Sequence, residues 1–72
     1  MNEDLVIMAN NTLHELESLD NRGPTHEWNK QWNNMRFIVK SPCRWGRRQD
    51  EHLLENANKF LLARRMARLR NR

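Results

Sequence analysis

Glycine, proline and cysteine are scarce in this 72-residue chain, and each scarcity excludes a class of protein. The two glycines, Gly23 and Gly46, cannot form a glycine-rich loop that cradles a phosphate group. The single cysteine, Cys43, cannot form an internal disulfide, which is typical of a reducing compartment. No apolar run reaches the roughly 18 residues that a membrane-spanning helix needs. Residues 1–4 are acidic and do not begin a signal peptide. We therefore expect a cytoplasmic protein with no membrane partner.

The short, polar chain also limits the chemistry that we expect. Its 72 residues suffice for one small domain, and 38% of them are hydrophobic and 31% charged. A domain of this size buries only about 60% of the surface of its unfolded chain, so it has little scaffold for a deep substrate pocket. The potential metal ligands, which show none of the close pairings of metal sites, are His14, His26, His52 and Cys43. We expect no enzyme activity, cofactor, metal or small-molecule substrate.

Charge is divided unevenly along the sequence. Residues 1–35 carry six acidic and two basic residues, a net charge of −4, whereas residues 36–72 carry three acidic and eleven basic residues, a net charge of +8. Ten of the thirteen basic residues are arginines, whose planar guanidinium groups suit phosphate and carboxylate. This asymmetry predicts that the second half faces a polyanion, which is DNA, RNA or an acidic protein surface.

The first 24 residues predict one helix and an ambiguous start. Leu5-Val6-Ile7-Met8 is an apolar run that fits a short strand, the first turn of a helix, or an anchor that is buried only on a partner. Asn11 is a favourable N-cap, and Leu13 and Leu16 follow at helical spacing. Gly23-Pro24 then predicts the end of this helix.

A second helix is expected after Thr25, a further favourable N-cap. Its apolar stripe, which we interpret most simply as core, consists of Trp28, Trp32, Met35 and Val39. Phe37-Ile38-Val39 favours a strand instead, so a helix to about Asn34 followed by a short strand stays open.

The longest helix is predicted near the C-terminus. Ser41-Pro42 breaks the preceding element, and residues 43–48 form a connecting loop around Gly46. Asp50 is expected to cap a helix from about Glu51 to Arg70. Its predicted apolar stripe is Leu53, Ala57 and Phe60, widened by Leu54 and Leu61. The later apolar residues that we expect to scatter over different faces, so that the last turns project, are Leu62, Met66 and Leu69.

Together these elements predict a mainly α fold, a small three-helix domain with a basic C-terminal helix. The alternative is a small α+β domain with a short strand around Phe37–Val39. We divide the chain into an N-terminal segment at 1–10 that can anchor a partner, a compact domain at 11–62, and a basic projecting end at 63–72.

Two arginine-rich segments are candidate binding sites. Trp45 lies in a loop among arginines, where it can stack on a base or fold back over the core. Near the C-terminus, arginines crowd one helix with no acid after Glu55, and a polyanion would relieve their repulsion. The candidate nucleic-acid or acidic-surface residues are Arg44, Trp45, Arg47, Arg48, Arg64, Arg65, Arg68 and Arg70. The candidate protein-binding residues are Leu5, Val6 and Ile7.

The chain resembles a known family of proteins in its size, its distribution of charge and two of its segments. Leu5-Val6-Ile7 at one end and Arg64-Arg65-Met66-Ala67-Arg68-Leu69-Arg70 at the other resemble the small phage-encoded RNA-polymerase-binding transcription regulators of the Xanthomonas phage type. The resemblance implies binding to bacterial RNA polymerase subunits near the RNA exit region, displacement of the initiation factor, and antitermination during host takeover. It assigns no role to an individual residue.

Two other functions remain open from the residues alone. The first is a stand-alone DNA-binding repressor of helix-turn-helix type, in which the helix after Thr25 contacts DNA. Lys30 is its one clear basic contact as far as Asn34, and its Asn and Gln side chains suit adenine. The second is a small RNA-binding module that stacks single-stranded bases on Trp45.

Overall fold

The computed structural model describes residues 3–19 and 25–70, and these fold into three helices. α1 spans Glu3–Leu19, α2 spans His26–Lys40 and α3 spans Arg47–Arg70. The three-helix prediction is confirmed, and the described ranges contain no strand. The α+β alternative is therefore wrong. Ile38 lies in the last turns of α2 and is fully buried, because helical spacing places it in the core and this outweighs its β-propensity.

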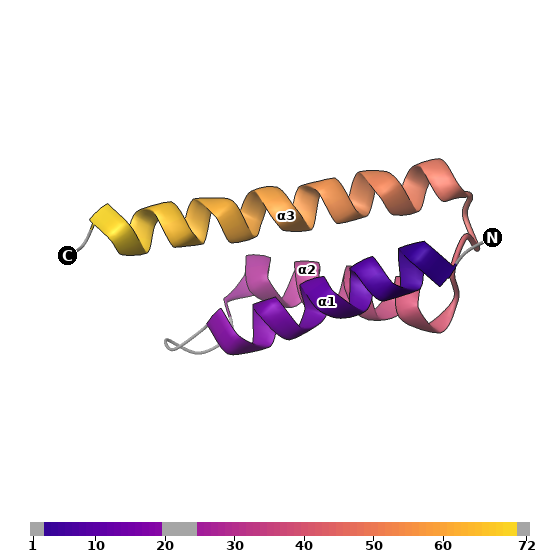
Figure 1. The fold of residues 1–72 in the computed structure, drawn as a ribbon, viewed down its shortest axis with the longest axis horizontal. Coiled ribbons are helices and arrows are strands. Elements are labelled where there is room, and N and C mark those ends of the chain that lie inside the picture. Colours follow the sequence, from indigo (N-terminus) through magenta and orange to yellow (C-terminus); the bar gives the residue numbers. More distant parts are fainter. Residues whose placement is uncertain (1–2, 20–24, 71–72) are drawn as a thin grey trace.

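The helices form an elongated bundle of 42 × 18 × 17 Å. α1 and α2 run antiparallel, and α3 lies along both of them (Figure 1). α1 and α3 therefore run in the same direction, with their N-terminal ends at the same end of the bundle (Figure 1). The last turns of α3 extend past the other two helices (Figure 1).

α1 begins earlier than expected. Leu5, Ala9 and Leu16 are buried on one face of a continuous helix, so the apolar run before Asn11 is helical. Asn11 lies exposed in mid-helix, and its prediction as an N-cap is wrong. The acidic residues at the start of α1 suit the positive end of the helix dipole. The predicted stop at Gly23-Pro24 lies outside the described residues.

α2 begins as predicted. The Thr25 hydroxyl accepts a hydrogen bond from the Trp28 backbone N–H at 3.1 Å and caps the helix. Trp28 packs against the core, stacks on Trp32 with ring centroids 6.4 Å apart, and donates its indole N–H to the Leu16 carbonyl at 2.9 Å. The tryptophan stripe is thus core, as expected. The buried centre of this face is completed by Gln31, Met35 and Ile38.

α3 starts at Arg47, four residues before the predicted start at Glu51. Asp50 is not its N-cap. It lies in the first turn, and its buried carboxylate accepts the Cys43 backbone N–H at 2.7 Å. The core residues that α3 contributes are Leu54, Ala57 and Leu61, with Leu53 and Phe60 packed beside them. Most of the predicted stripe is therefore correct, although its centre lies one residue away.

The helices cross both proposed segment boundaries without a break. α1 continues through residue 10, and α3 continues through residue 63. Leu5 and Ala9 belong to the core, so residues 3–10 are part of the folded domain and not a separate segment. No helix of the described chain has the length and apolar character to span a membrane.

Candidate nucleic-acid interface

The turn between α2 and α3 directs Trp45 into solvent. Cys43 and Gly46 both have positive φ, at 59° and 99°, and the Gly46 N–H donates to the Cys43 carbonyl at 3.2 Å. This tight reversal leaves Trp45 70% exposed. The alternative in which Trp45 folds back over the core is therefore wrong. The exposed ring is available to stack on a base or to enter a protein interface.

Arg44 and Arg48 flank this tryptophan and are also exposed. The Arg44 guanidinium lies 5.9 Å from the centre of the Trp45 ring, within the range of a cation–π contact. None of the ion pairs within residues 3–19 and 25–70 involves Arg44 or Arg48. These two positive charges are therefore not neutralised by a carboxylate of the described chain.

Arg47 has a different role, although it lies in the same segment. It donates two hydrogen bonds to the Asp4 carboxylate, at 2.6 and 3.3 Å, and lies 3.7 Å from Glu51. The hydrogen bond from Arg47 lowers the pKa of Asp4, and the same bond raises the pKa of Arg47. Arg47 therefore ties the start of α3 to the start of α1.

The second predicted cluster, at the end of α3, is partly occupied by internal contacts. Arg65 pairs with Glu15 of α1 at 2.6 Å. Arg64 donates to the Thr25 hydroxyl at 3.1 Å and lies over the Phe60 ring at 5.0 Å. The remaining members, whose side chains lie outside the described part of the structure, are Arg68 and Arg70. Arg64 follows Arg47 by 17 positions, or about 25 Å of helix at 1.5 Å per residue. The structure thus separates the two arginine clusters and does not join them into one site.

A third group of cations lies on α2, of which sequence reasoning named Lys30 but missed Arg36 and Lys40. Lys30, Arg36 and Lys40 are exposed and take part in no ion pair of the described chain. The signal was present, because residues 28–49 contain six basic residues and no acidic one. Counting charge separately for residues 1–35 and 36–72 splits this stretch between the two halves. If the helix is taken to end at Asn34, Arg36 and Lys40 also fall outside it.

The predicted protein-binding run is only partly on the surface. Leu5 is 1% exposed and belongs to the core, so it cannot bind a partner without unpacking the bundle. Val6 is half-buried, whereas Ile7 is exposed, as is Met8 beside it. The helical conformation explains the division, because consecutive residues of a helix point in directions about 100° apart.

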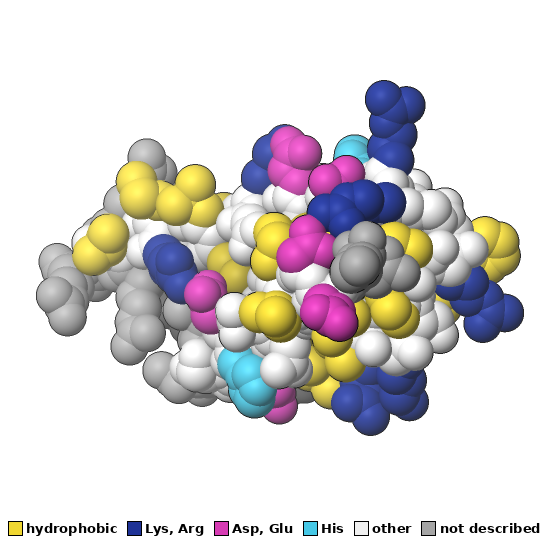
Figure 2. Space-filling model, turned by 45° about the vertical axis from the view of Figure 1, so that its right-hand side comes forward, with side chains coloured by type: hydrophobic (Ala, Val, Ile, Leu, Met, Phe, Trp, Pro, Cys, Tyr) yellow, Lys and Arg dark blue, Asp and Glu magenta, His cyan; other side chains and the backbone are white. Residues whose placement is uncertain are grey.

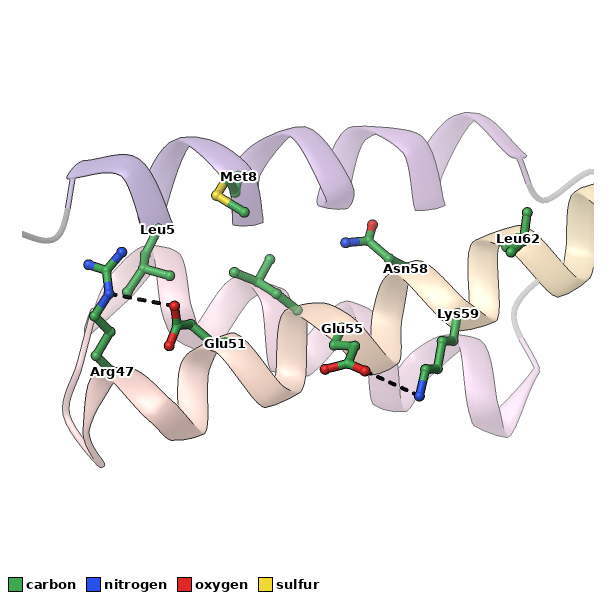
Figure 3. A pocket seen from close by; sticks show the side chains of 9 residues that line it. Leu5, Met8, Arg47, Glu51, Glu55, Asn58, Lys59 and Leu62 are labelled. Carbon is green, nitrogen blue, oxygen red and sulfur yellow. Dashed lines mark ion pairs between the residues drawn. The ribbon is translucent and has the colours of Figure 1, made fainter.

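A shallow groove of about 440 Å³ lies between α1 and α3 (Figure 3). Leu5 and Met8 line it from α1, while Leu54 and Leu62 line it from α3. The charged and polar residues of its lining all come from α3 and are Arg47, Glu51, Glu55, Asn58 and Lys59. The interactions drawn there, Arg47 with Glu51 and Glu55 with Lys59, lie along α3 itself (Figure 3). The groove is thus apolar between the helices and charged along one rim.

The apolar residues beyond the groove share one side of α3. Leu62, Met66 and Leu69 are all more than half exposed, and in the continuous helix they occupy positions i, i+4 and i+7. The prediction that they scatter over different faces is therefore wrong. Figure 2 shows apolar side chains gathered at the end where α3 projects, on the left of the view. The chain thus has an exposed apolar strip at one end and an arginine-bearing turn at the other.

Within the part of the chain that the structure describes, no group of three or more His, Cys, Asp or Glu residues could hold a metal ion. The exposed side chains of Arg44, Trp45 and Arg48 form a surface of two cations and one aromatic ring. No family model, curated protein or solved structure matches this chain.

Proposed function

We propose that this chain is a non-enzymatic regulatory protein of the bacterial cytoplasm that binds RNA polymerase and modulates transcription, by inhibiting initiation or by antitermination. The observation that supports this proposal is the separation of two exposed surfaces. Arg44, Trp45 and Arg48 form one of them, and the apolar strip of α3 lies towards the other end. The choice of RNA polymerase as the partner, and of a phage as the source, rests on the resemblance given above.

The apolar strip is the surface that we assign to the polymerase. Leu62, Met66 and Leu69 are 52–63% exposed on α3. Ile7 is also 60% exposed, but it lies near the start of α1, at the end of the bundle where Asp4 pairs with Arg47, and is not part of this strip. Exposed apolar groups rimmed by polar residues mark protein–protein contacts. This assignment moves the protein-binding surface from the predicted Leu5, Val6 and Ile7 to the exposed apolar residues near the end of α3.

The turn that carries Trp45 is the surface that we assign to nucleic acid or an acidic subunit. Its arginines can contact phosphates and release counterions, which makes this contact strongly dependent on salt. Two modest contacts joined in one chain strengthen each other through a high effective concentration. Occupying a channel or the docking site of a transcription factor is then sufficient for regulation, and no covalent step is required.

A pull-down from bacterial lysate tests this proposal. Tagged protein is incubated with lysate at moderate salt, and half of each sample is treated with nuclease. We expect stoichiometric RNA polymerase in both halves. Loss of all polymerase after nuclease treatment would contradict direct docking, because polymerase would then be captured only through nucleic acid.

A matched pair of variants tests the assigned protein surface. Leu62→Ser, Met66→Ser and Leu69→Ser together should abolish capture of polymerase, because they remove the apolar side chains of the strip. The fold should be retained, because these exposed side chains contribute little to the core. His14→Ser and Glu17→Ser, at exposed positions of α1, should leave capture unchanged. Equal capture by both variants would show that the apolar strip is not the docking surface.

A small RNA-binding module is the second candidate function, and the exposure of Trp45 favours it. Stacking one base on an aromatic side chain contributes about 1–3 kcal/mol. Trp45→Ala should therefore weaken binding to a single-stranded oligouridine, measured by fluorescence anisotropy. Lys59→Ala, on the exposed side of α3, serves as the control. Unchanged affinity in the Trp45 variant would exclude this function.

A further inference from the structure

The outer face of α2 carries cations and amides without a carboxylate. Its exposed side chains, apart from Glu27 at the start of the helix, are His26, Asn29, Lys30, Asn33, Arg36 and Lys40. At 100° per residue these six lie within an arc of about 120° around the helix. Glu27 is the one acid of α2, and it lies to the side, where its carboxylate accepts a hydrogen bond from the Gln31 amide at 3.1 Å. The face is therefore uniformly neutral or positive.

The opposite face of α2 fixes this arrangement. Met35 and Ile38 are fully buried, and Trp28 and Trp32 pack against the core. Because the buried face cannot rotate, the cations are held outward. Arg36 is further ordered by its guanidinium, which lies 5.6 Å from the centre of the Trp32 ring. Less side-chain freedom is then given up when this arginine meets an anion.

The spacing of these residues suits a nucleic-acid duplex. Lys30, Arg36 and Lys40 follow one another along the helix axis at intervals of about 9 and 6 Å, at 1.5 Å per residue. Asn29 and Asn33 lie between and beside them, one helical turn apart. Lysine and arginine contact phosphates, whereas asparagine forms paired hydrogen bonds with adenine at its major-groove edge.

We propose that the outer face of α2 binds duplex DNA, with the helix in the major groove. A helix with its side chains is about 10–12 Å wide, and the major groove of B-DNA is about 12 Å wide. The major groove of duplex RNA is too deep and narrow to admit such a helix, which is why DNA is the partner. Lys30, Arg36 and Lys40 contact phosphates, and Asn29 and Asn33 face base edges. This inference goes beyond the proposed function, because it concerns the outer face of α2 and not the turn that carries Trp45.

Fluorescence anisotropy over a range of salt concentrations tests the proposal. The probes are a labelled DNA duplex of about 20 base pairs, roughly two helical turns, the RNA duplex of the same sequence, and one DNA strand alone. The test variant combines Lys30→Gln, Arg36→Gln and Lys40→Gln. The control is Lys59→Gln, which removes a positive charge from an exposed position of α3.

We expect the unaltered protein to prefer the DNA duplex over both other probes. The slope of log affinity against log salt should fall by about 2.7 in the α2 variant, which is about 0.9 for each phosphate that the three side chains neutralise. The α3 control should keep most of the original slope. An equal fall in the two variants, or tighter binding of duplex RNA or of the single strand, would overturn the proposal.

Amide chemical shifts of the unaltered protein provide a measurement that does not depend on variants. Addition of the DNA duplex should shift the amides of α2 between Asn29 and Lys40, and shifts confined to α3 would overturn the proposal. Capture of polymerase separates the two proposals. If the unaltered protein binds the DNA duplex but captures no polymerase, the docking function alone is contradicted. If the α2 variant still captures polymerase after losing DNA binding, the two functions use different surfaces.

Discussion

The buried carboxylate of Asp50 accepts a hydrogen bond from the backbone N–H of Cys43 at 2.7 Å. Asp50 is fully buried in the first turn of α3, and Cys43 has a left-handed backbone with φ of 59°. This contact joins the start of α3 to the turn that follows α2. It therefore holds the backbone of the turn two residues before Trp45.

Replacing Asp50 should destabilise the fold. Asp50→Ala leaves the Cys43 N–H without its carboxylate partner, and losing a hydrogen bond of this kind costs about 1–3 kcal/mol. Asp50→Asn retains an oxygen acceptor and should lose less. The free energy of unfolding in urea measures both effects, with Gln49→Ala at the adjacent exposed position as the control. Equal stability of the Gln49 and Asp50 alanine variants would show that the hydrogen bond does not stabilise the turn.

Thr25 supports two elements at once. Its hydroxyl caps α2 by accepting the Trp28 N–H, and it also accepts a hydrogen bond from Arg64 of α3. Thr25→Ala should lower the free energy of unfolding by about 1 kcal/mol, the usual value of an N-cap. Thr25→Ser keeps the hydroxyl and should retain most of this stability, and Ser18→Ala, at an exposed position of α1, should cost less than Thr25→Ala. If Thr25→Ser were as destabilising as Thr25→Ala in urea unfolding, capping by the hydroxyl would be contradicted.

Acid should weaken the tie between α1 and α3. The hydrogen bond from Arg47 lowers the pKa of Asp4 in the folded protein, so the carboxylate is charged more readily when folded than when unfolded. A group with a lowered pKa contributes stability above its unfolded pKa and loses it as the pH falls through its folded pKa. The contribution of Asp4 should therefore be complete above about pH 4 and decline below it.

Thermal unfolding over a pH series measures this effect. The difference in Tm between the unaltered protein and Asp4→Asn should be constant near neutral pH and shrink in acid. Glu17→Gln is the control, because Glu17 forms no ion pair within the described chain. A difference that stays constant throughout the acid range would contradict a role for the Asp4 charge.

Periodicity predicted the helices well where capping and apolar spacing agreed. Thr25 and the stripe through Trp28 and Met35 placed α2 correctly, since one N-cap hydroxyl and one buried face act together. The start of α1 was misplaced because Asn11 is also a favourable cap, although the apolar run before it continues the same face. Local capping preference is weaker than the burial of Leu5 and Ala9.

The candidate site was predicted less well, because exposure and pairing are tertiary properties. Arg47 and Arg48 are neighbours in sequence, yet the packing of α1 against α3 gives the first a carboxylate partner. Arg65 likewise meets Glu15, which lies 50 positions earlier. The packing of α1 therefore decides which arginines form ion pairs. The local sequence of the arginine-rich segments does not contain this information.

Fluorescence can distinguish the exposed tryptophan from the two packed ones. Trp45→Phe should remove most of the emission that acrylamide quenches and change the stability by no more than about 0.5 kcal/mol, as for other surface substitutions. Trp28→Phe should cost more, about 1 kcal/mol or above, because it removes the hydrogen bond to the Leu16 carbonyl and alters the stack on Trp32. If the Trp45 variant lost as much stability as the Trp28 variant, Trp45 would belong to the core, and the surface assigned to nucleic acid would lack its aromatic ring.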